Sequence, residues 1–275
     1  MSNAANNLAL AALIAAVALT GCKSESARRA ERAEALRLEA ETLASSGDYE
    51  QSIALLDSLD RTYHEQTDAR RRALANRATA IEGLTLKKIA PADSLMALSQ
   101  LRADSLATLF TWVEGPMGLE GHYVANELKG HDVTDATGIE PRVDPDGYLS
   151  IAAVVKGRSI GMNSLSLTTA AGNTRSAKAD PSRVLNSEGS ELTSFRQEDV
   201  SDLMQALVAA GDGPVALHID GDKGSVEVKL TPALRDALVR SWQLAQARQQ
   251  LRSAQIERER LERTLQTARN HKANA

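Results

Sequence analysis

Two histidines and two carboxylates in the middle of the chain are the residues best suited to chemistry. Glu120 and His122 are two positions apart, so in a strand their side chains would share one face, and His131 and Asp132 follow downstream. Residues of these types can form an acid–base pair or hold a metal ion. No further ligand follows at a recognisable metal-site spacing. We therefore expect polar surface here, with no catalytic residue, no metal and no cofactor.

A second acidic motif, Asp-Pro-Asp-Gly at residues 144–147, resembles the opening of a calcium-binding loop. A calcium loop would continue with carboxylates at alternate positions, whereas Tyr148, Leu149 and Ser150 follow here. The motif therefore predicts a turn before a strand. The sequence also contains no Gly-x-Ser-x-Gly elbow, no His-Glu-x-x-His pair and no phosphate-binding glycine loop. These absences favour a protein that is not an enzyme.

The one cysteine, Cys22, follows an apolar run at residues 8–19. The run is shorter than the roughly 20 residues that cross a bilayer, but it has the length of the apolar region of a signal peptide. The sequence Leu19-Thr20-Gly21-Cys22 resembles the bacterial lipobox. That resemblance implies cleavage before Cys22 and acylation of its thiol and new amino group, for example with palmitate. The alternative is an uncleaved apolar N-terminus with a buried cysteine.

The location of the protein follows from this motif. We expect a signal peptide at residues 1–21 and a mature chain held in the cell envelope by lipid on Cys22, at the outer membrane rather than the inner one. With 43% apolar and 25% charged residues, the chain is predicted to be globular. Residues 89–231 are acidic and residues 232–275 are basic. The acidic middle excludes a nucleic-acid partner, because such binding requires neutralisation of phosphates.

Residues 22–110 are predicted to form a helical region. Apolar side chains recur at helical spacing in residues 24–44 and 49–63, with Gly47 between them. With Gly47 at the turn and Tyr49 after it, the pair resembles a tetratricopeptide-type hairpin. No second copy follows, and a solenoid needs about three repeats, so we expect a single hairpin and not a peptide-binding array. Two further helices are expected, at residues 67–88 and from Pro91 to residue 109.

An Asp-Ser-Leu triple occurs three times in this region, at residues 57–59, 93–95 and 104–106. The triples resemble the acceptor sequence of bacterial general O-glycosylation. The alternative is a polar pair beside a core leucine on an amphipathic helix.

Residues 111–231 are predicted to form a β-rich domain, because short β-prone runs alternate here with Gly, Pro, Asn and Asp. One amphipathic helix is expected at residues 197–210. The final two strands should form a hairpin around residues 220–224. The fold class is therefore α+β with a mostly antiparallel sheet. The expected strands are residues 111–114, 122–127, 148–155, 159–166, 182–185, 214–220 and 225–230.

Residues 232–275 are predicted to form one long coiled-coil helix, with Thr231 as N-cap and Pro232 in the first turn. Small and leucine side chains recur every three or four residues from Leu244 to Ala268, interrupted by Arg258. We expect this helix to pack antiparallel on the preceding helices as a stalk. The alternative is a parallel dimer, which would bring two copies of Arg258 together, so we expect a monomer.

This layout resembles a group of uncharacterised lipoproteins from Bacteroidota-type bacteria, which also combine a lipid anchor, a Gly-Asp-Tyr helical turn, a small β-rich domain and a long C-terminal helix. The resemblance implies a cell-envelope lipoprotein and implies no catalytic residues. We therefore expect a structural or protein-interaction module that contacts the membrane through its anchor and a protein partner in the envelope. The alternative is a ligand-binding protein or hydrolase that uses the acidic β domain.

Overall fold

The computed structural model describes residues 24–115, 120–187 and 189–274. The predicted signal peptide, residues 1–21, and Cys22 lie outside these ranges. The chain divides into two compact units. Within the described residues, the helical unit comprises residues 24–92 and 258–274, and the β unit comprises residues 93–257.

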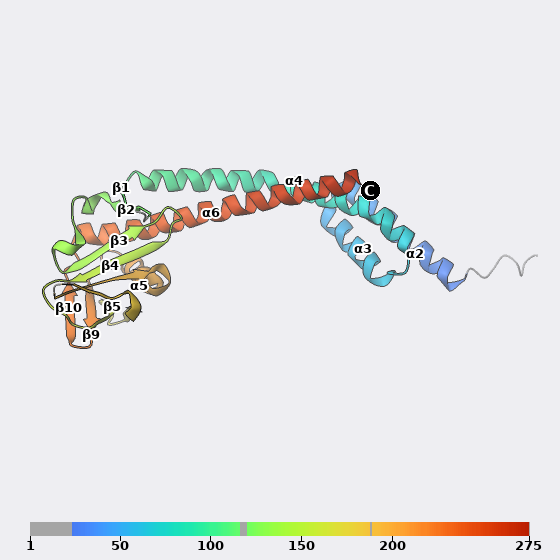
Figure 1. The fold of residues 1–275 in the computed structure, drawn as a ribbon. Helices are drawn as coiled ribbons and strands as arrows, with labels where there is room; N and C mark the ends of the chain where they lie inside the picture. The colour runs from blue at the N-terminus through green and yellow to red at the C-terminus, as the bar shows by residue number, and fades with distance from the viewer. Residues whose placement is uncertain (1–23, 116–119, 188, 275) are drawn as a thin grey trace, which may run out of the picture. The chain divides into compact units, whose positions relative to one another are not determined.

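The helical unit begins with the predicted hairpin, made of α2 (Glu25–Ser46) and α3 (Tyr49–Thr62) (Figure 1). Ser24 caps α2, because its hydroxyl accepts a hydrogen bond from the Ala27 amide at 3.2 Å. Gly47 ends α2 with a φ of 87°, the left-handed conformation that glycine adopts most easily. The turn predicted at Gly47 is confirmed.

Small side chains allow the helices of this unit to approach closely. Ala40 of α2 and Ala73 of α4 (Thr67–Ala107) are buried with Leu56 and Leu59 of α3. The buried Ser52 hydroxyl donates to the Ala40 carbonyl at 2.7 Å, which satisfies both polar groups across the hairpin. The hairpin is therefore joined to α4 through one small core.

Pro91 lies inside a continuous helix, which corrects the prediction of two helices. α4 runs from Thr67 to Ala107 without interruption. Proline removes one backbone donor and disfavours a helix interior by about 3 kcal/mol. Pro91 is exposed, as is Lys87 one turn before it, so the carbonyl that loses its partner lies at the surface. The helix tolerates the proline because water can reach this site.

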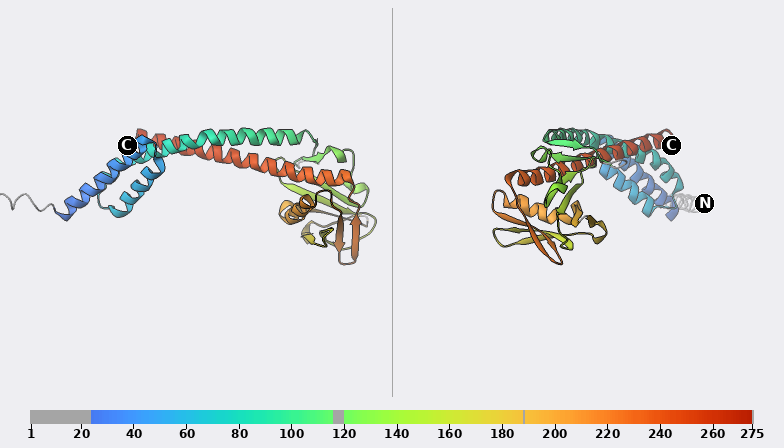
Figure 2. Two further views of the ribbon diagram at one scale, coloured as in Figure 1. Left: turned by 180° about the vertical axis from the view of Figure 1, so that it is seen from behind. Right: turned by 60° about the vertical axis from the view of Figure 1, so that its left-hand side comes forward.

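The C-terminal helix α6 (Pro232–Ala273) packs antiparallel on α4, as predicted, and the parts of both helices that share a unit lie side by side (Figures 1 and 2). Thr231 caps α6, accepting from the Leu234 amide at 3.2 Å. The seam is only partly as predicted. Leu251, Arg258 and Leu265 are half-buried. The buried seam positions are Leu244, Ala247, Ala254, Leu261 and Ala268.

The β unit contains two antiparallel sheets, which confirms the α+β class (Figure 2). Sheet A has the order β1-β2-β3-β4-β8-β7, with β1 (Phe110–Val113), β2 (His122–Ala125), β3 (Gly138–Val143), β4 (Leu149–Val155), β8 (Ser190–Arg196) and β7 (Leu185–Ser187). Sheet B has the order β10-β9-β5-β6, with β10 (Gly224–Val228), β9 (Val215–Gly221), β5 (Met162–Thr169) and β6 (Thr174–Lys178). The predicted hairpin corresponds to β9 and β10, and α5 spans Gln197–Ala210 as predicted.

Three strands of the β unit, β3, β6 and β8, were not predicted. The strand predicted at residues 182–185 overlaps β7 only at Leu185, because Pro181–Arg183 forms a 3-10 helix. β3 contains Pro141, which argues against a strand inside a sheet. The ladder from β2 to β3 is limited to Tyr123 and Val143, so the proline interrupts little pairing there. In β8 the polar side chains of Glu191 and Thr193 face the core and are buried. A strand usually places apolar side chains on that face. Because polar residues occupy its buried positions, β8 lacks the alternation of apolar and polar residues that predicts a strand.

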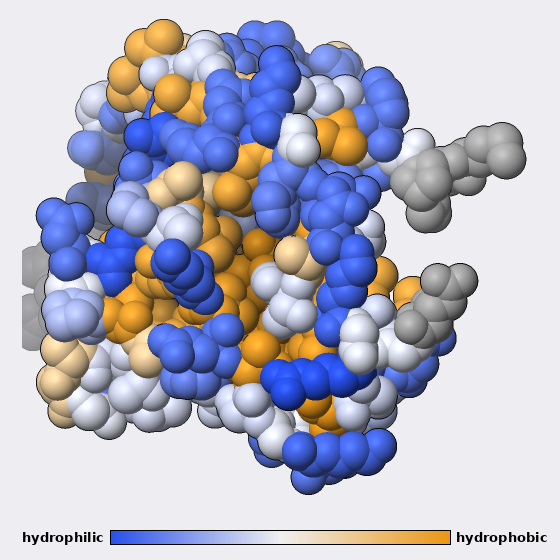
Figure 3. Space-filling view, turned by 90° about the vertical axis from the view of Figure 1, so that its left-hand side faces the viewer, coloured by the Kyte–Doolittle hydropathy of each residue, from blue (hydrophilic) through white to orange (hydrophobic). Residues whose placement is uncertain are grey.

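One hydrophobic core joins the two sheets, α5 and the first part of α6. Figure 3 views the molecule from the side of the β unit and shows apolar side chains gathered near the centre, bordered by hydrophilic residues. The opposite face of sheet A points away from this core and carries different side chains. There Glu140 is paired in register with Ala152, and Arg142 with Ser150, so these four side chains share one face. The short helix η2 (Val133–Asp135) covers part of this outer face through Val133.

Candidate functional site

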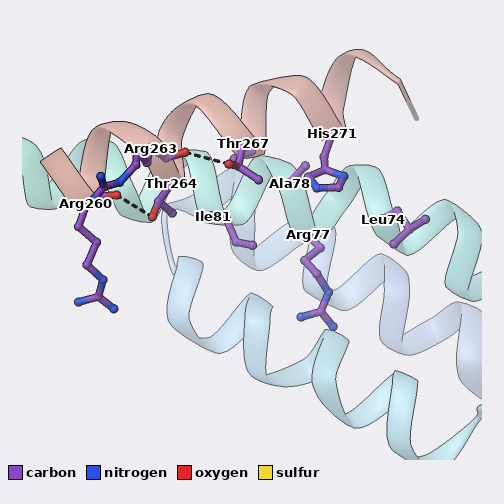
Figure 4. A pocket seen from close by; sticks show the side chains of 10 residues that line it. Leu74, Arg77, Ala78, Ile81, Arg260, Arg263, Thr264, Thr267 and His271 are labelled. Atoms are coloured by element: carbon purple, nitrogen blue, oxygen red, sulfur yellow. Dashed lines mark hydrogen bonds between the residues drawn. The ribbon is translucent and has the colours of Figure 1, made fainter.

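A groove of about 480 Å³ lies between α4 and α6 in the helical unit (Figure 4). The α4 side contributes an apolar floor of Leu74, Ala78 and Ile81. Leu74 keeps 58% of its surface exposed, although leucine is usually covered. The remaining lining residues are Arg77, Arg260, Arg263, Thr264, Thr267, Ala268 and His271.

The ionisable side chains that line this groove are all basic. Its lining includes three arginines and a histidine and contains no acidic side chain. Arg77 is held on α3 by Asp57 at 2.5 Å and by Asp60 at 2.8 Å, so its charge is largely balanced. On α6, the Thr264 and Thr267 hydroxyls donate to carbonyls of their own helix at 2.9 Å (Figure 4). The threonines are thus internally satisfied, and the groove combines an apolar floor with a basic rim.

Glu82 fixes the end of α6 beside this groove. Its two carboxylate oxygens accept from Arg269 at 3.0 Å and from Lys272 at 3.1 Å. The Arg269 hydrogen bond, followed by that of Lys272, holds the pKa of Glu82 below its ordinary value. These pairs attach the last turns of α6 to α4 and so maintain the wall of the groove.

The four residues predicted as a polar cluster lie on the outer face of sheet A. His122, His131 and Asp132 line one recess of about 390 Å³, and Glu120 lines a neighbouring recess of about 430 Å³. Within the described residues, no group of three His, Cys, Asp or Glu side chains is arranged to hold a metal ion. The sequence thus identified residues that share a surface but do not form a ligand set.

Asp132 has a structural role within this cluster. Its carboxylate accepts from the Thr134 hydroxyl at 2.7 Å and from the Thr134 amide at 2.8 Å, which caps η2. These two hydrogen bonds hold the pKa of Asp132 below its ordinary value.

His122 is a second titratable side chain of this surface with a shifted pKa. Burial is the main reason why its pKa is lowered, and the nearby Arg142 charge acts in the same direction. The carboxylate of Glu140 opposes both effects. The imidazole of His122 is therefore neutral at physiological pH and offers one nitrogen donor and one nitrogen acceptor.

The Asp-Pro-Asp-Gly motif forms a turn, as predicted. The Asp144 carboxylate accepts from the Tyr148 amide at 2.7 Å, and Gly147 has a φ of 91°. Gly147 also lies against α6, where an added methyl group would come within 2.6 Å of Arg248. The motif therefore places the start of β4 beside α6.

Glu191 is an important residue that sequence analysis missed. Its carboxylate is buried and accepts from the Ser159 hydroxyl at 2.6 Å and from the amides of Ile160, Gly161 and Met162 at 2.9–3.1 Å. Burial by itself would raise its pKa, but these hydrogen bonds together outweigh it and lower the pKa. Glu191 therefore fastens the loop before β5 to β8. Its position inside an unpredicted strand left no sequence signal.

No known protein family, curated protein or solved structure matches this chain. Among the described residues, no helix has both the length and the apolar character needed to cross a bilayer.

Proposed function

We propose that this protein is a lipid-anchored cell-envelope lipoprotein that acts as a structural or protein-interaction module and not as an enzyme. The sequence Leu19-Thr20-Gly21-Cys22 after a short apolar run supports the anchor. Acyl chains on Cys22 would hold the chain at the membrane, because each buried CH₂ group contributes about 0.8 kcal/mol. We assign the chain to the outer membrane in preference to the inner one.

The basic groove of the helical unit is the observation that carries the interaction role. Its apolar floor is formed by a helix with exposed Leu74, and its rim is basic. A partner that fits needs apolar residues along one face and acidic residues along its flanks, which describes an acidic amphipathic helix. We therefore assign the groove to such a helix from another envelope protein.

A photo-crosslinking amino acid at position 264 tests this assignment in cells that produce the full chain. Thr264 lines the groove, whereas Arg71 is exposed on α4 of the same unit and does not line it. We expect position 264 to capture a peptide with an acidic amphipathic pattern, and position 71 to capture none. Capture of a second copy of this chain, of a basic or neutral peptide, or of nothing would contradict the assignment.

Two matched variants give the test its control. Leu74 and Leu38 are both exposed leucines of the helical unit, at 58% and 50%, and only Leu74 lines the groove. Because neither side chain is buried, replacing either with glutamate should preserve the fold. We expect Leu74→Glu to abolish the crosslink from position 264, since a carboxylate on the groove floor would face the partner's apolar side, and Leu38→Glu to leave it intact.

A further inference from the structure

Two recesses on the outer face of sheet A share a pair of side chains. His122 of β2 and Arg142 of β3 line both the recess of about 390 Å³ and the recess of about 430 Å³. The two recesses are therefore neighbours within the β unit. A ligand that contacts Arg142 can extend into either one.

Arg142 is held in a fixed orientation by a buried carboxylate. Its Nε donates to Glu140 Oε1 at 2.7 Å, and Glu140 is only 4% exposed. Among the described residues, no hydrogen bond occupies Nη1 or Nη2 of Arg142, and its side chain keeps 34% of its surface exposed. Pairing through Nε leaves the terminal edge of the guanidinium group ready to bind an oxyanion.

The smaller recess surrounds Arg142 with further hydrogen-bond donors. Lys129 and His131 line it from the loop between η1 (Asn126–Leu128) and η2. Each of its acidic residues binds a neighbour through one carboxylate oxygen, Glu140 through Oε1 to Arg142 and Asp132 through Oδ1 to Thr134. Arg142, Lys129 and His131 are the donors that suit a carboxylate or another oxyanion.

The larger recess combines acceptors with a second arginine, Arg196, whose Nη1 lies 4.0 Å from Glu198 Oε1. Glu120 and Glu198 line it, together with the Ser150 hydroxyl. Tyr148 also lines it and leaves 59% of its surface exposed, so a ring face is available to an apolar patch of a ligand. Carboxylates repel a second anionic group but accept hydrogen bonds from hydroxyl groups.

We infer that the two recesses form one binding site for a polyhydroxylated organic anion of the sugar-acid class. The carboxylate of the ligand pairs with Arg142 beside His131 and Lys129, and its hydroxyl groups donate to Glu120 and Glu198. This site lies in the β unit and does not depend on the groove proposed for a partner helix.

Calorimetric titration of the chain from residue 23 onward tests this inference, with glucuronate and galacturonate as anionic probes, glucose as the neutral probe and inorganic phosphate as the probe without a sugar ring. We expect at least one uronate to bind at least about tenfold more tightly than glucose, because glucose lacks the group that pairs with Arg142. Phosphate should bind more weakly than the uronate. Failure of both uronates to bind, or equal binding of glucose, would overturn the inference.

Three variants locate the site. Arg142→Gln should weaken uronate binding by about tenfold or more. Arg175→Gln removes an exposed arginine of β6 outside both recesses and should leave binding unchanged. His131→Ala, in an exposed loop, should weaken binding without risk to the fold, and circular dichroism checks all three. Unchanged binding in Arg142→Gln and His131→Ala would overturn the inference.

Discussion

The two units of this chain achieve burial with different side chains. In the helical unit the buried apolar residues are mostly alanines, such as Ala33, Ala40, Ala78 and Ala80. The β unit instead buries large side chains completely, with Phe195 the largest of them. Alanine gains little from burial but lets helix backbones approach closely, whereas each large side chain contributes about 1.5–3 kcal/mol. Stability is thus spread thinly over the helices and concentrated in the β unit.

The two units also differ in where they place charged side chains. Some ion pairs of the helical unit lie at the surface, as between Arg29 and Glu65, where such pairs contribute little. The β unit buries Glu191 and Glu140 and satisfies both with hydrogen bonds. Removing one partner of a buried charge leaves the other uncompensated, so the β unit should be the more sensitive to single polar substitutions.

The largest expected effect is in the core of the β unit. Phe195 is fully buried between the sheets, so Phe195→Ala leaves a cavity and should lower the free energy of unfolding by about 3–5 kcal/mol. Urea unfolding measures the loss. The control is Val208→Ala on α5, because Val208 is 42% exposed. A change below about 1 kcal/mol in Phe195→Ala would contradict a concentrated core.

A smaller loss is expected at the seam between α4 and α6. Leu261 is 7% exposed, and Leu261→Ala should cost about 2–3 kcal/mol, at the low end for leucine because small neighbours can close the gap. Leu251 is half-buried, so Leu251→Ala should cost less. Hydrogen exchange of the α6 amides measures the loss of stability in each of the two variants. Equal effects at both positions would show that the seam is not packed as described.

The stability that charged Glu191 contributes to the β unit should depend on pH. Its lowered pKa means that its stabilisation is complete above the ordinary glutamate pKa of 4.5 and is lost as pH falls through the lower folded value. Glu191→Gln should cost about 2 kcal/mol at pH 7, because the amide group cannot accept all four hydrogen bonds. Thermal unfolding from pH 7 to pH 3 should show this difference shrinking in acid. A difference that is constant with pH would rule out a charged Glu191.

The smallest expected effect is at Gly83 of α4. An added methyl group would lie 2.2 Å from the Tyr49 ring, so Gly83→Ala forces the tyrosine to move. Overpacking costs about 1–3 kcal/mol, and the better helix propensity of alanine returns about 1 kcal/mol. We expect a net loss of about 1 kcal/mol in urea unfolding. The double variant with Tyr49→Ala should no longer show the loss, and a persistent loss would exclude this contact as its cause.

The elements that sequence analysis predicted best are those in which local pattern and burial agree. Gly47, Thr231 and the helix at residues 197–210 have a cap or a clear amphipathic pattern, and each lies where it was expected. β3 and β8 were missed because Pro141 and Glu191 occupy positions where a strand usually carries a backbone donor or an apolar side chain. Tertiary hydrogen bonds and limited pairing compensate there, and neither is visible in a local sequence pattern.

The candidate sites were predictable only in part. His122, His131 and Asp132 were identified from their residue types, but Arg142 was not, because its orientation depends on Glu140 and on the register of β3 with β4. The groove was also not predicted. Its floor on α4 and its wall on α6 come from opposite ends of the sequence, and only folding brings them together.

The proposed location at the membrane depends on the lipid anchor at Cys22, and metabolic labelling with radioactive palmitate tests that anchor most directly. Cells producing the wild-type chain or Cys22→Ser are labelled, and the purified protein is assayed for incorporated label. We expect strong labelling of the wild type and none of Cys22→Ser, with the variant retaining its signal peptide. Equal incorporation into both chains would contradict the anchor and, with it, the assignment to the membrane.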